Sequence, residues 1–456
     1  MDRKKMLKFL CSTGHLGTAP IKEASFYAGI EENPDYIIAD SGSDDVGPGA
    51  LGANKSFSSE RNQKHDLELM LVESRKKNIP MIIGSAGDCG SKVMVDRYIK
   101  YIKEIALKHK LPKFKIGYFY SDLTKNYLKN LLKKGKEIKG LDGRKNLTMG
   151  DIDKTNNIVA VAGIHPYHKA LDMGVDVIIG GRSGDVAIFA APAIREGFPE
   201  GLAYCLGKIM ECASFCAEPY GAKETIIGII TEQDIKVKAM HPEQYCTVAS
   251  VAGHAMYERS NPYFEYFVGG MLDMSSCQYV QYDKKTCCIT GPKFIPAEEI
   301  RVKIEGAGKV GERYIGIAGI RDPYSIKNID RVIAWCRKQV QEQFPGEKYE
   351  LYFHIYGKNG VMEEWEPVRE VRSHELCIVV EGVAATKELA KEITFCGWMQ
   401  LFYARLPDVK GTAGSAAFIT HETIYDGVAY EWTMNHTIPV NNPMDLFKVK
   451  FTYSDE

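Results

Sequence analysis

The sequence lacks the features that mark nucleic-acid-binding, membrane and secreted proteins. Its net charge at neutral pH is −1, so we expect no general attraction for nucleic acid or anionic membranes. No apolar run approaches the roughly 20 residues of a membrane helix. The stretch 1–10 also lacks the apolar core and the cleavage site of a signal peptide. We therefore expect a cytoplasmic protein with neither a nucleic-acid nor a membrane partner.

Familiar cofactor and metal motifs are also missing. The 12 cysteines form no CxxC pair, which in a reducing compartment favours buried small apolar residues over a zinc ribbon or disulfides. The chain has neither the GxGxxG spacing of a dinucleotide site nor the lysine pattern of a P-loop. We thus find no NAD, flavin or ATP motif, and the cofactor stays unknown. A nucleotide-dependent ligase is disfavoured for the same reason.

What the sequence does contain is an alternation of apolar β-branched runs with helical patterns. At 456 residues it is long enough for two or more domains. Alternating strands and helices predict an α/β domain with a doubly wound, mostly parallel sheet and helices on both faces. We place this Rossmann-like domain at residues 1–221, closed by a helix over 202–217. Its expected strands are 7–12, 36–40, 81–84, 115–120, 158–162 and 175–180.

From residue 222 onward the pattern becomes richer in strands. A strand at 314–320 is followed by a helix at 325–343, and two further strands precede a second helix at 386–406. This β-α-β-β-α order predicts a smaller α+β domain of ferredoxin-like architecture over residues 222–456.

Several expected strands end in Gly, Ser and Asp, where an open α/β sheet delivers residues to a binding crevice. The first such break is STGHLG, which contains Ser12, Gly14 and His15. Its backbone amides are suited to bind a phosphate or carboxylate, and His15 can exchange protons near neutral pH. A structural turn explains the segment about as well.

The second break, after the strand at 36–40, carries three acids in a Gly/Pro-rich loop: Asp40, Asp44 and Asp45. Clustered carboxylates can ligate a divalent cation or hold one proton at a raised pKa. The alternative is that Asp and Gly simply favour turns.

The third break, GSAGDCG, contains Gly87, Asp88 and Cys89. Asp88 is a candidate general base, or else a cap of the next helix. Cys89 as a nucleophile is disfavoured, since no histidine partner is recognisable.

The fourth break, GGRSGD, supplies Gly181, Arg182, Ser183 and Asp185. Arginine suits bidentate recognition of a carboxylate or phosphate, and the glycines allow close approach of the backbone. We expect Arg182 to hold the substrate anion, with Asp185 as a catalytic candidate. A purely structural pair between Arg182 and Asp185 is the alternative.

Histidines give two further candidates. His254 shares one turn of an expected helix with Tyr257 and Glu258, where imidazole and acid can face a crevice. His165 and His168 have an HxxH spacing, but helix-capping or core roles explain this pair better than a metal site.

Four stretches resemble the AtuA-type acyclic terpene utilisation family: 175–194, 207–219, 250–294 and, more loosely, 413–422. The resemblance implies an α/β N-terminal domain and a role near acyl-CoA or organic-acid catabolism. The segment 41–56 departs from the usual start of the terpene branch, which favours a smaller, more polar acid than a terpenoid. The shared motifs of the family map onto Arg182, Asp185, Glu211, His254, Tyr257, Glu258 and Asp273.

These observations lead to a lyase or isomerase of the hydration or dehydration type. Its substrate is a carboxylic or hydroxycarboxylic acid or its CoA thioester, held by Arg182 and by backbone amides near Gly87. Asp88, or a carboxylate of the 40–45 loop, moves a proton, and His254 or His15 assists the hydroxyl. A divalent metal at the 40–45 loop is an option. The alternative is a non-catalytic, acyl-ligand-binding subunit that depends on a small partner, and we expect a homo-oligomer.

Overall fold

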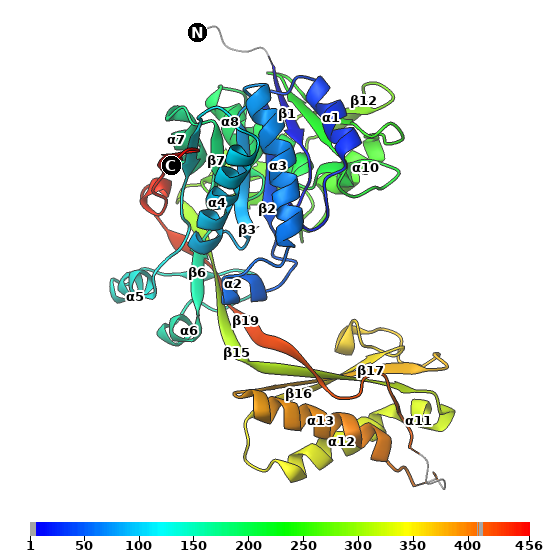
Figure 1. The fold of residues 1–456 in the computed structure, drawn as a ribbon. Coiled ribbons are helices and arrows are strands. Elements are labelled where there is room, and N and C mark those ends of the chain that lie inside the picture. The colour runs from blue at the N-terminus through cyan, green and yellow to red at the C-terminus, as the bar shows by residue number, and fades with distance from the viewer. Residues whose placement is uncertain (1–5, 408, 410–413) are drawn as a thin grey trace. The chain divides into compact units, whose positions relative to one another are not determined.

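The computed structural model describes residues 6–407, 409 and 414–456 and divides the chain into two compact units (Figure 1). Unit 1 comprises residues 1–308 and 432–456, and unit 2 comprises residues 309–431. No helix among the described residues has the length and apolar character needed to cross a membrane. The chain as a whole is a mixed α/β protein.

Unit 1 is built around a ten-stranded sheet whose centre is parallel. The five parallel strands, in spatial order, are β1 (Leu7–Cys11), β2 (Tyr36–Gly42), β3 (Met81–Asp88), β7 (Val177–Ile179) and β4 (Lys115–Tyr118). Antiparallel strands extend both edges: β8 (Ile226–Ile230), β9 (Ile235–Ala239), β13 (Thr286–Thr290) and β12 (Gln278–Gln281) beyond β1, and β20 (Lys450–Tyr453) beyond β4. The sheet is therefore mixed rather than mostly parallel.

Alternating side chains of the central strands enter two separate hydrophobic cores. Ile37 and Ala39 belong to one core, while Tyr36 and Ile38 belong to the other, as the two-residue period of a strand requires. The first core also holds residues of α3 (Glu60–Lys76) and α4 (Lys92–Lys108). The second holds residues of α7 (His165–Asp172), α8 (Ala187–Arg195) and α9 (Glu200–Met210). Helices thus cover both faces, while the doubly wound assignment stays a prediction.

A small sheet and several short elements complete unit 1. The small sheet is antiparallel and consists of β10 (Phe264–Phe267), β11 (Gly270–Asp273) and β14 (Lys293–Pro296). Helix α10 (Val248–Ala255) begins at a capping box formed by Thr247 and Ser250. The remaining elements are α1 (Glu23–Glu31), α2 (Gly49–Ala53), α5 (Lys125–Lys133), β5 (Lys139–Gly140), α6 (Met149–Lys154), β6 (Asn157–Ala160), η1 (Ala213–Cys216) and η3 (Pro443–Asp445).

Two long strands, β15 (Arg301–Ile320) and β19 (Ile424–Pro439), run from one unit into the other. In unit 2 the strand order is β16-β17-β15-β19. The other elements there are α11 (Pro323–Lys327), α12 (Ile329–Gln343), β16 (Tyr349–Tyr356), η2 (Glu363–Trp365), β17 (Leu376–Ala384), α13 (Lys387–Tyr403) and β18 (Ala417–Phe418). The expected β-α-β-β-α order is present, while the ferredoxin-like assignment stays a prediction.

The boundary between the units differs from the one that the sequence suggested. It lies at residues 308/309 rather than at 221/222, because β8 and β9 pair with β1 and extend the first sheet. The C-terminal residues 432–456 also return to unit 1, where β20 pairs with β4.

Candidate active site at the ends of the parallel strands

The carboxyl ends of β1, β2, β3 and β7 lie at one edge of the sheet, since these strands are parallel neighbours. The loops that follow them carry most of the candidates named from the sequence. The end of β3 and the turn after it have a backbone that favours glycine: Ser85, Gly87, Asp88 and Gly90 have φ angles of 46°, 61°, 70° and 59°. Left-handed backbone at a non-glycine such as Asp88 is uncommon and often accompanies a functional site.

Asp88 accepts hydrogen bonds from four residues on two other segments. His15 Nε2 lies 2.6 Å from Oδ1, and Ser58 Oγ donates to the same oxygen at 2.8 Å. The other oxygen accepts from Ser56 Oγ and from the backbone amides of Phe57 (2.7 Å) and Ser58 (3.0 Å). Burial opposes ionisation of Asp88, but the bonds from His15, Ser56 and Ser58 outweigh it and lower its pKa. This geometry favours a positioning role over that of a general base, because both carboxylate oxygens are saturated.

Arg182 lies in an ion cluster that is buried at Arg182 and Glu305 and exposed at Asp44. Its Nε donates to Glu305 Oε2 at 2.8 Å, and its Nη2 donates to Asp44 Oδ1. Lys303 Nζ joins the same two acids, at 2.9 Å from Glu305 Oε1 and 3.2 Å from Asp44 Oδ2. Despite burial, Arg182 and Lys303 hold the pKa of Glu305 at about 2. The cluster of two cations and two anions is electrically balanced, and the partners of Arg182 are Glu305 and Asp44 rather than Asp185.

Asp40 is buried at the end of β2 in a setting that favours its neutral form. Burial, followed by the negative charge of Asp185, raises its pKa to about 7, while Arg182 acts in the opposite direction. Its Oδ2 accepts the backbone amide of Gly42 at 2.9 Å, whereas Oδ1 has no hydrogen-bond partner among the described residues. A carboxyl group that is half protonated near neutral pH is suited to proton transfer.

A second charged cluster surrounds Lys208, which is only 4% exposed, near the end of α9. Its ammonium lies 2.5 Å from Glu211 Oε1 and 3.9 Å from Glu265 Oε2, and Arg259 Nη1 lies 3.1 Å from the latter oxygen. Burial and then the charge of Asp185 raise the pKa of Glu211. Asp185 itself is exposed and acts on Asp40, Glu211 and Lys208 through its charge, so it links Asp40 electrostatically with the Lys208 cluster.

His254 borders the Lys208 cluster. Its ring stacks on Tyr257 at 4.8 Å between centroids, and Tyr257 OH lies 2.9 Å from Cys212 Sγ. Burial, with Lys208 and Arg259 nearby, lowers the pKa of His254 to about 4. Its Nε2 is buried without a hydrogen-bond partner in the described part of the chain. His254 is therefore neutral at pH 7 and retains one unused ring nitrogen.

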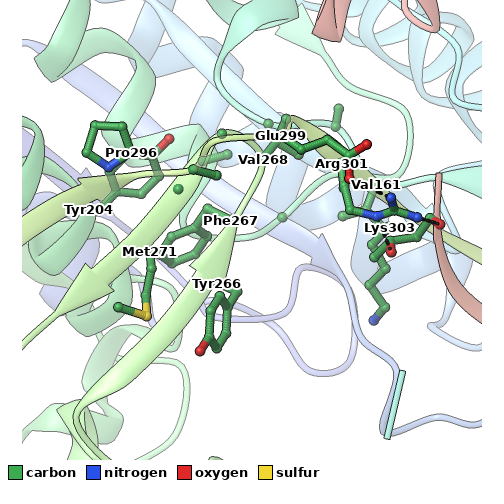
Figure 2. A pocket seen from close by; sticks show the side chains of 18 of the residues that line it. Val161, Tyr204, Tyr266, Phe267, Val268, Met271, Pro296, Glu299, Arg301 and Lys303 are labelled. Atoms are coloured by element: carbon green, nitrogen blue, oxygen red, sulfur yellow. Dashed lines mark hydrogen bonds and ion pairs between the residues drawn. The ribbon is translucent and has the colours of Figure 1, made fainter. Parts of the chain in front are cut away.

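An apolar pocket of about 620 Å³ opens beside these clusters, within the size range of ligand sites (Figure 2). Gly184, between Ser183 and Asp185, forms part of its wall. Figure 2 shows Tyr204, Phe267, Met271 and Pro296 toward one end and Glu299, Arg301 and Lys303 toward the other. The donors of Arg301 are used by Glu299, Thr437 and a backbone carbonyl. Lys303 therefore connects the pocket with the Arg182 cluster.

The other residues predicted to bind an anion make close contacts within the protein. Ser12 is fully buried with its Oγ 3.3 Å from Met70 Sδ, and Ser183 Oγ bonds to Tyr167 OH at 2.6 Å. A Cβ atom at Gly14 would lie 2.5 Å from the Cα of Cys212, and one at Gly181 would lie 2.5 Å from Ser121 Oγ. One at Gly87 would lie 2.8 Å from Met94 Sδ. These glycines allow close approach of protein segments, and their role in holding a ligand stays a prediction.

The loop 40–45 does not form a cation site. Both oxygens of Asp44 contact cationic side chains, Asp40 is buried and Asp45 is exposed. Among the described residues, no group of three or more His, Cys, Asp or Glu side chains is arranged to hold a metal ion. These donors do not fit the divalent metal considered from the sequence, because Asp44 is committed to Arg182 and Lys303.

Sequence reasoning missed Lys208 and Glu305, whereas Glu211 was among the motifs that the resemblance to the family pointed to. Lys208 and Glu211 are three positions apart in an otherwise apolar helix, and this spacing is a readable signal of a buried pair. Glu305 is 123 positions from Arg182, and no local pattern indicates their pairing.

The protein is thus a mixed α/β protein in which unit 1 carries buried ionisable side chains near an apolar pocket. The family model of the acyclic terpene utilisation family protein AtuA matches residues 10–434, nearly the whole chain, so the chain belongs to this family. The match includes residues 41–56, which the sequence set apart from the family's usual beginning. No curated protein and no solved structure matches the chain.

Proposed function

We propose that the protein acts in the catabolism of acyclic terpenes, as a lyase or isomerase on a branched carboxylic acid or its CoA thioester. The observation that carries this proposal is the apolar pocket of about 620 Å³, whose charged end includes Lys303, a member of the Arg182 ion cluster. Membership of the acyclic terpene utilisation family supports the same substrate class.

The pocket argues for an apolar chain rather than the smaller, more polar acid expected from segment 41–56. Its walls are formed mainly by Val161, Tyr204, Phe267, Val268, Met271 and Ile295. Burying apolar surface contributes about 25 cal/mol per Å², so such walls favour a methyl-branched chain over a polar one. In the proposed complex the carboxylate or thioester oxygen lies at Lys303, and the chain extends toward Tyr204.

Two carboxyl groups with opposite pKa shifts support acid–base chemistry. The pKa of Asp40 is raised to about 7, whereas that of Glu305 is held at about 2. Environments that separate the pKa values of neighbouring acids are a pattern of acid and base roles in active sites. In the proposed step Asp40, once its enclosed carboxyl group has been opened to the pocket, donates the proton to the departing hydroxyl, so water leaves and a double bond forms. Neutral His254 accepts the proton removed from the adjacent carbon.

The residues of the 40–45 loop do not fit a metal, so no step passes through one. Asp88 with His15 fixes the segment 56–58 against the end of β3, and Asp185 tunes Asp40 and Glu211 by its charge. Arg182 orders Asp44 and Glu305 around Lys303.

A second candidate function is an acyl-ligand-binding subunit that needs a partner protein for turnover. The enclosure of Asp40 favours it: a Cβ atom at Gly84 would lie only 2.7 Å from Asp40 Oδ1 and 2.9 Å from the side chain of Ile188. Asp40 therefore reaches a ligand only if this part of the site opens, and a partner is one means of opening it.

The deciding experiment mixes the purified protein with one compound at a time and follows ultraviolet absorbance. The compounds are branched enoyl and hydroxyacyl CoA thioesters, their free acids and short polar acids. Turnover of the branched compounds that disappears in Asp40→Asn but persists in Asp45→Asn supports the enzyme. Asp45 is the matched control because it is exposed in the same loop. Binding without turnover favours the ligand-binding subunit, and turnover confined to small polar acids contradicts the proposed substrate class.

A further inference from the structure

Unit 2 contains a cavity that the proposed function does not use. It has a volume of about 510 Å³ and lies beside α11 and the segment 369–374. Four cationic side chains line it: Arg321, Lys327, Lys358 and Arg369. Two acids also line it, Asp330 and Glu370, so the wall carries an excess of positive charge.

Both of these acids already have cationic partners. Asp330 forms an ion pair with Lys358, and Glu370 Oε2 accepts from Arg372 Nε at 3.1 Å. Within the part of the chain that the structure describes, no ion pair engages Arg321, Lys327 or Arg369. Arg369 Nη2 donates a hydrogen bond to the backbone carbonyl of Glu364 at 3.3 Å, which leaves the charge of Arg369 unpaired among the described residues. Three cations around one cavity therefore retain their capacity for an anion.

Arg321 also lines an adjoining cavity of about 550 Å³ with a more apolar wall. Ile320, Leu376, Ala417 and Ile419 contribute to that wall. Of the two acids there, Asp322 accepts the amide of Ser325 at 2.6 Å as the cap of α11, and Glu375 is exposed. A ligand that spans Arg321 would thus place an anionic part among arginines and an uncharged ring system against aliphatic side chains.

We propose that unit 2 binds a nucleoside diphosphate or a ligand that contains one. Guanidinium groups match phosphate oxygens through paired hydrogen bonds, and Arg321 and Arg369 provide two such groups. Lys327 adds a third positive charge, and the hydroxyl of Ser373 adds a neutral donor. The base and ribose lie in the adjoining cavity against Ala417 and Ile419, whose side chains are exposed. This site lies wholly within residues 309–431 and does not depend on the reaction proposed for unit 1.

Isothermal titration calorimetry of the whole chain with ADP, pyrophosphate and adenosine tests the proposal. We expect ADP to bind, and its Kd to rise about tenfold in Arg321→Ala and in Arg369→Ala, because each variant removes one charge-assisted contact. Arg331→Ala is the matched control, since Arg331 is an exposed arginine of unit 2 that lines neither cavity. The arginines are exposed, so unchanged circular dichroism melting curves will confirm that the variants fold.

Each outcome decides a part of the proposal. ADP that binds at least tenfold more tightly than pyrophosphate supports both cavities as one site. Equal Kd values for ADP and pyrophosphate overturn the proposal that the base and ribose bind in the adjoining cavity. No heat with ADP at millimolar concentration, or the same Kd in Arg321→Ala and Arg369→Ala as in the unaltered chain, overturns the site itself.

Discussion

Asp44 places one carboxylate oxygen on Arg182 Nη2 and the other 3.2 Å from Lys303 Nζ, although its side chain is 46% exposed. Glu305 holds the same two cations from the buried side. A partly exposed carboxylate that bridges two cations beside a pocket occupies the position that a ligand carboxylate would take. Asp44 therefore competes with the acid proposed as substrate.

Replacing Asp44 should strengthen ligand binding. In Asp44→Asn, Arg182 and Lys303 face only Glu305, so an incoming carboxylate no longer displaces an anion. We expect the Kd of a branched carboxylic acid to fall about tenfold, as measured by calorimetry. Asp45→Asn should leave it unchanged. A weaker complex in Asp44→Asn would mean that Asp44 itself contacts the ligand.

Loss of the Asp88 carboxylate should reduce stability more than chemistry. Asp88→Asn removes an acceptor that serves His15, Ser56 and Ser58 and leaves buried donors unpaired. We expect the free energy of unfolding, measured by urea titration, to fall by about 2–3 kcal/mol. A fully stable variant with no turnover would instead restore Asp88 as the general base.

The parts of this site that a sequence reveals are those encoded locally. Gly, Ser and Asp after apolar runs predict the loops that follow β1, β2, β3 and β7, and parallel pairing brings these loops to one edge. The contact of His15 with Asp88 and that of Arg182 with Glu305 depend on residues 73 and 123 positions apart. Such pairing is set by tertiary packing, which no local pattern contains.

The same distinction between local patterns and tertiary packing decides which features of the fold the sequence predicts. The unbroken apolar run at the start of β2 predicts a strand buried on both faces, and the structure divides Ile37 and Ile38 between two cores. The direction in which β8 joins β1 is not encoded in its apolar run IIGII. The mixed character of the sheet and the later boundary between the units therefore required the structure.

The raised pKa of Asp40 predicts how activity and stability depend on pH. Burial raises this pKa to about 7, so turnover that needs the protonated carboxyl should decline as pH rises above about 7. Between the ordinary pKa of about 4 and this value, the folded protein keeps a proton that the unfolded chain releases. The contribution of Asp40 to stability is therefore full below pH 4 and is lost as pH rises to 7.

Asp40→Asn checks both consequences, because an amide stays neutral at every pH. The difference in stability between the variant and the unaltered chain should shift in favour of the variant between pH 5 and pH 8, as followed by urea unfolding. Turnover in the variant should be absent throughout. A stability difference that does not change with pH would show that Asp40 titrates as an ordinary exposed acid.

The apolar pocket can be narrowed at Gly184 without disturbing the protein around it. A Cβ atom there would have only one neighbour within 4 Å, the carbonyl oxygen of Ala162 at 3.8 Å, although Gly184 lines the pocket. Gly184→Val should therefore fold normally and place its methyl groups in space that the branched chain needs. We expect KM to rise about tenfold or more for long branched substrates, and to change little for short ones. Gly253→Ala in α10 is the control, because a Cβ atom there would have no neighbour within 4 Å. Gly174 also has open space, but its φ of 64° would strain a side chain. If KM rises equally for short and long substrates, the pocket does not hold the chain.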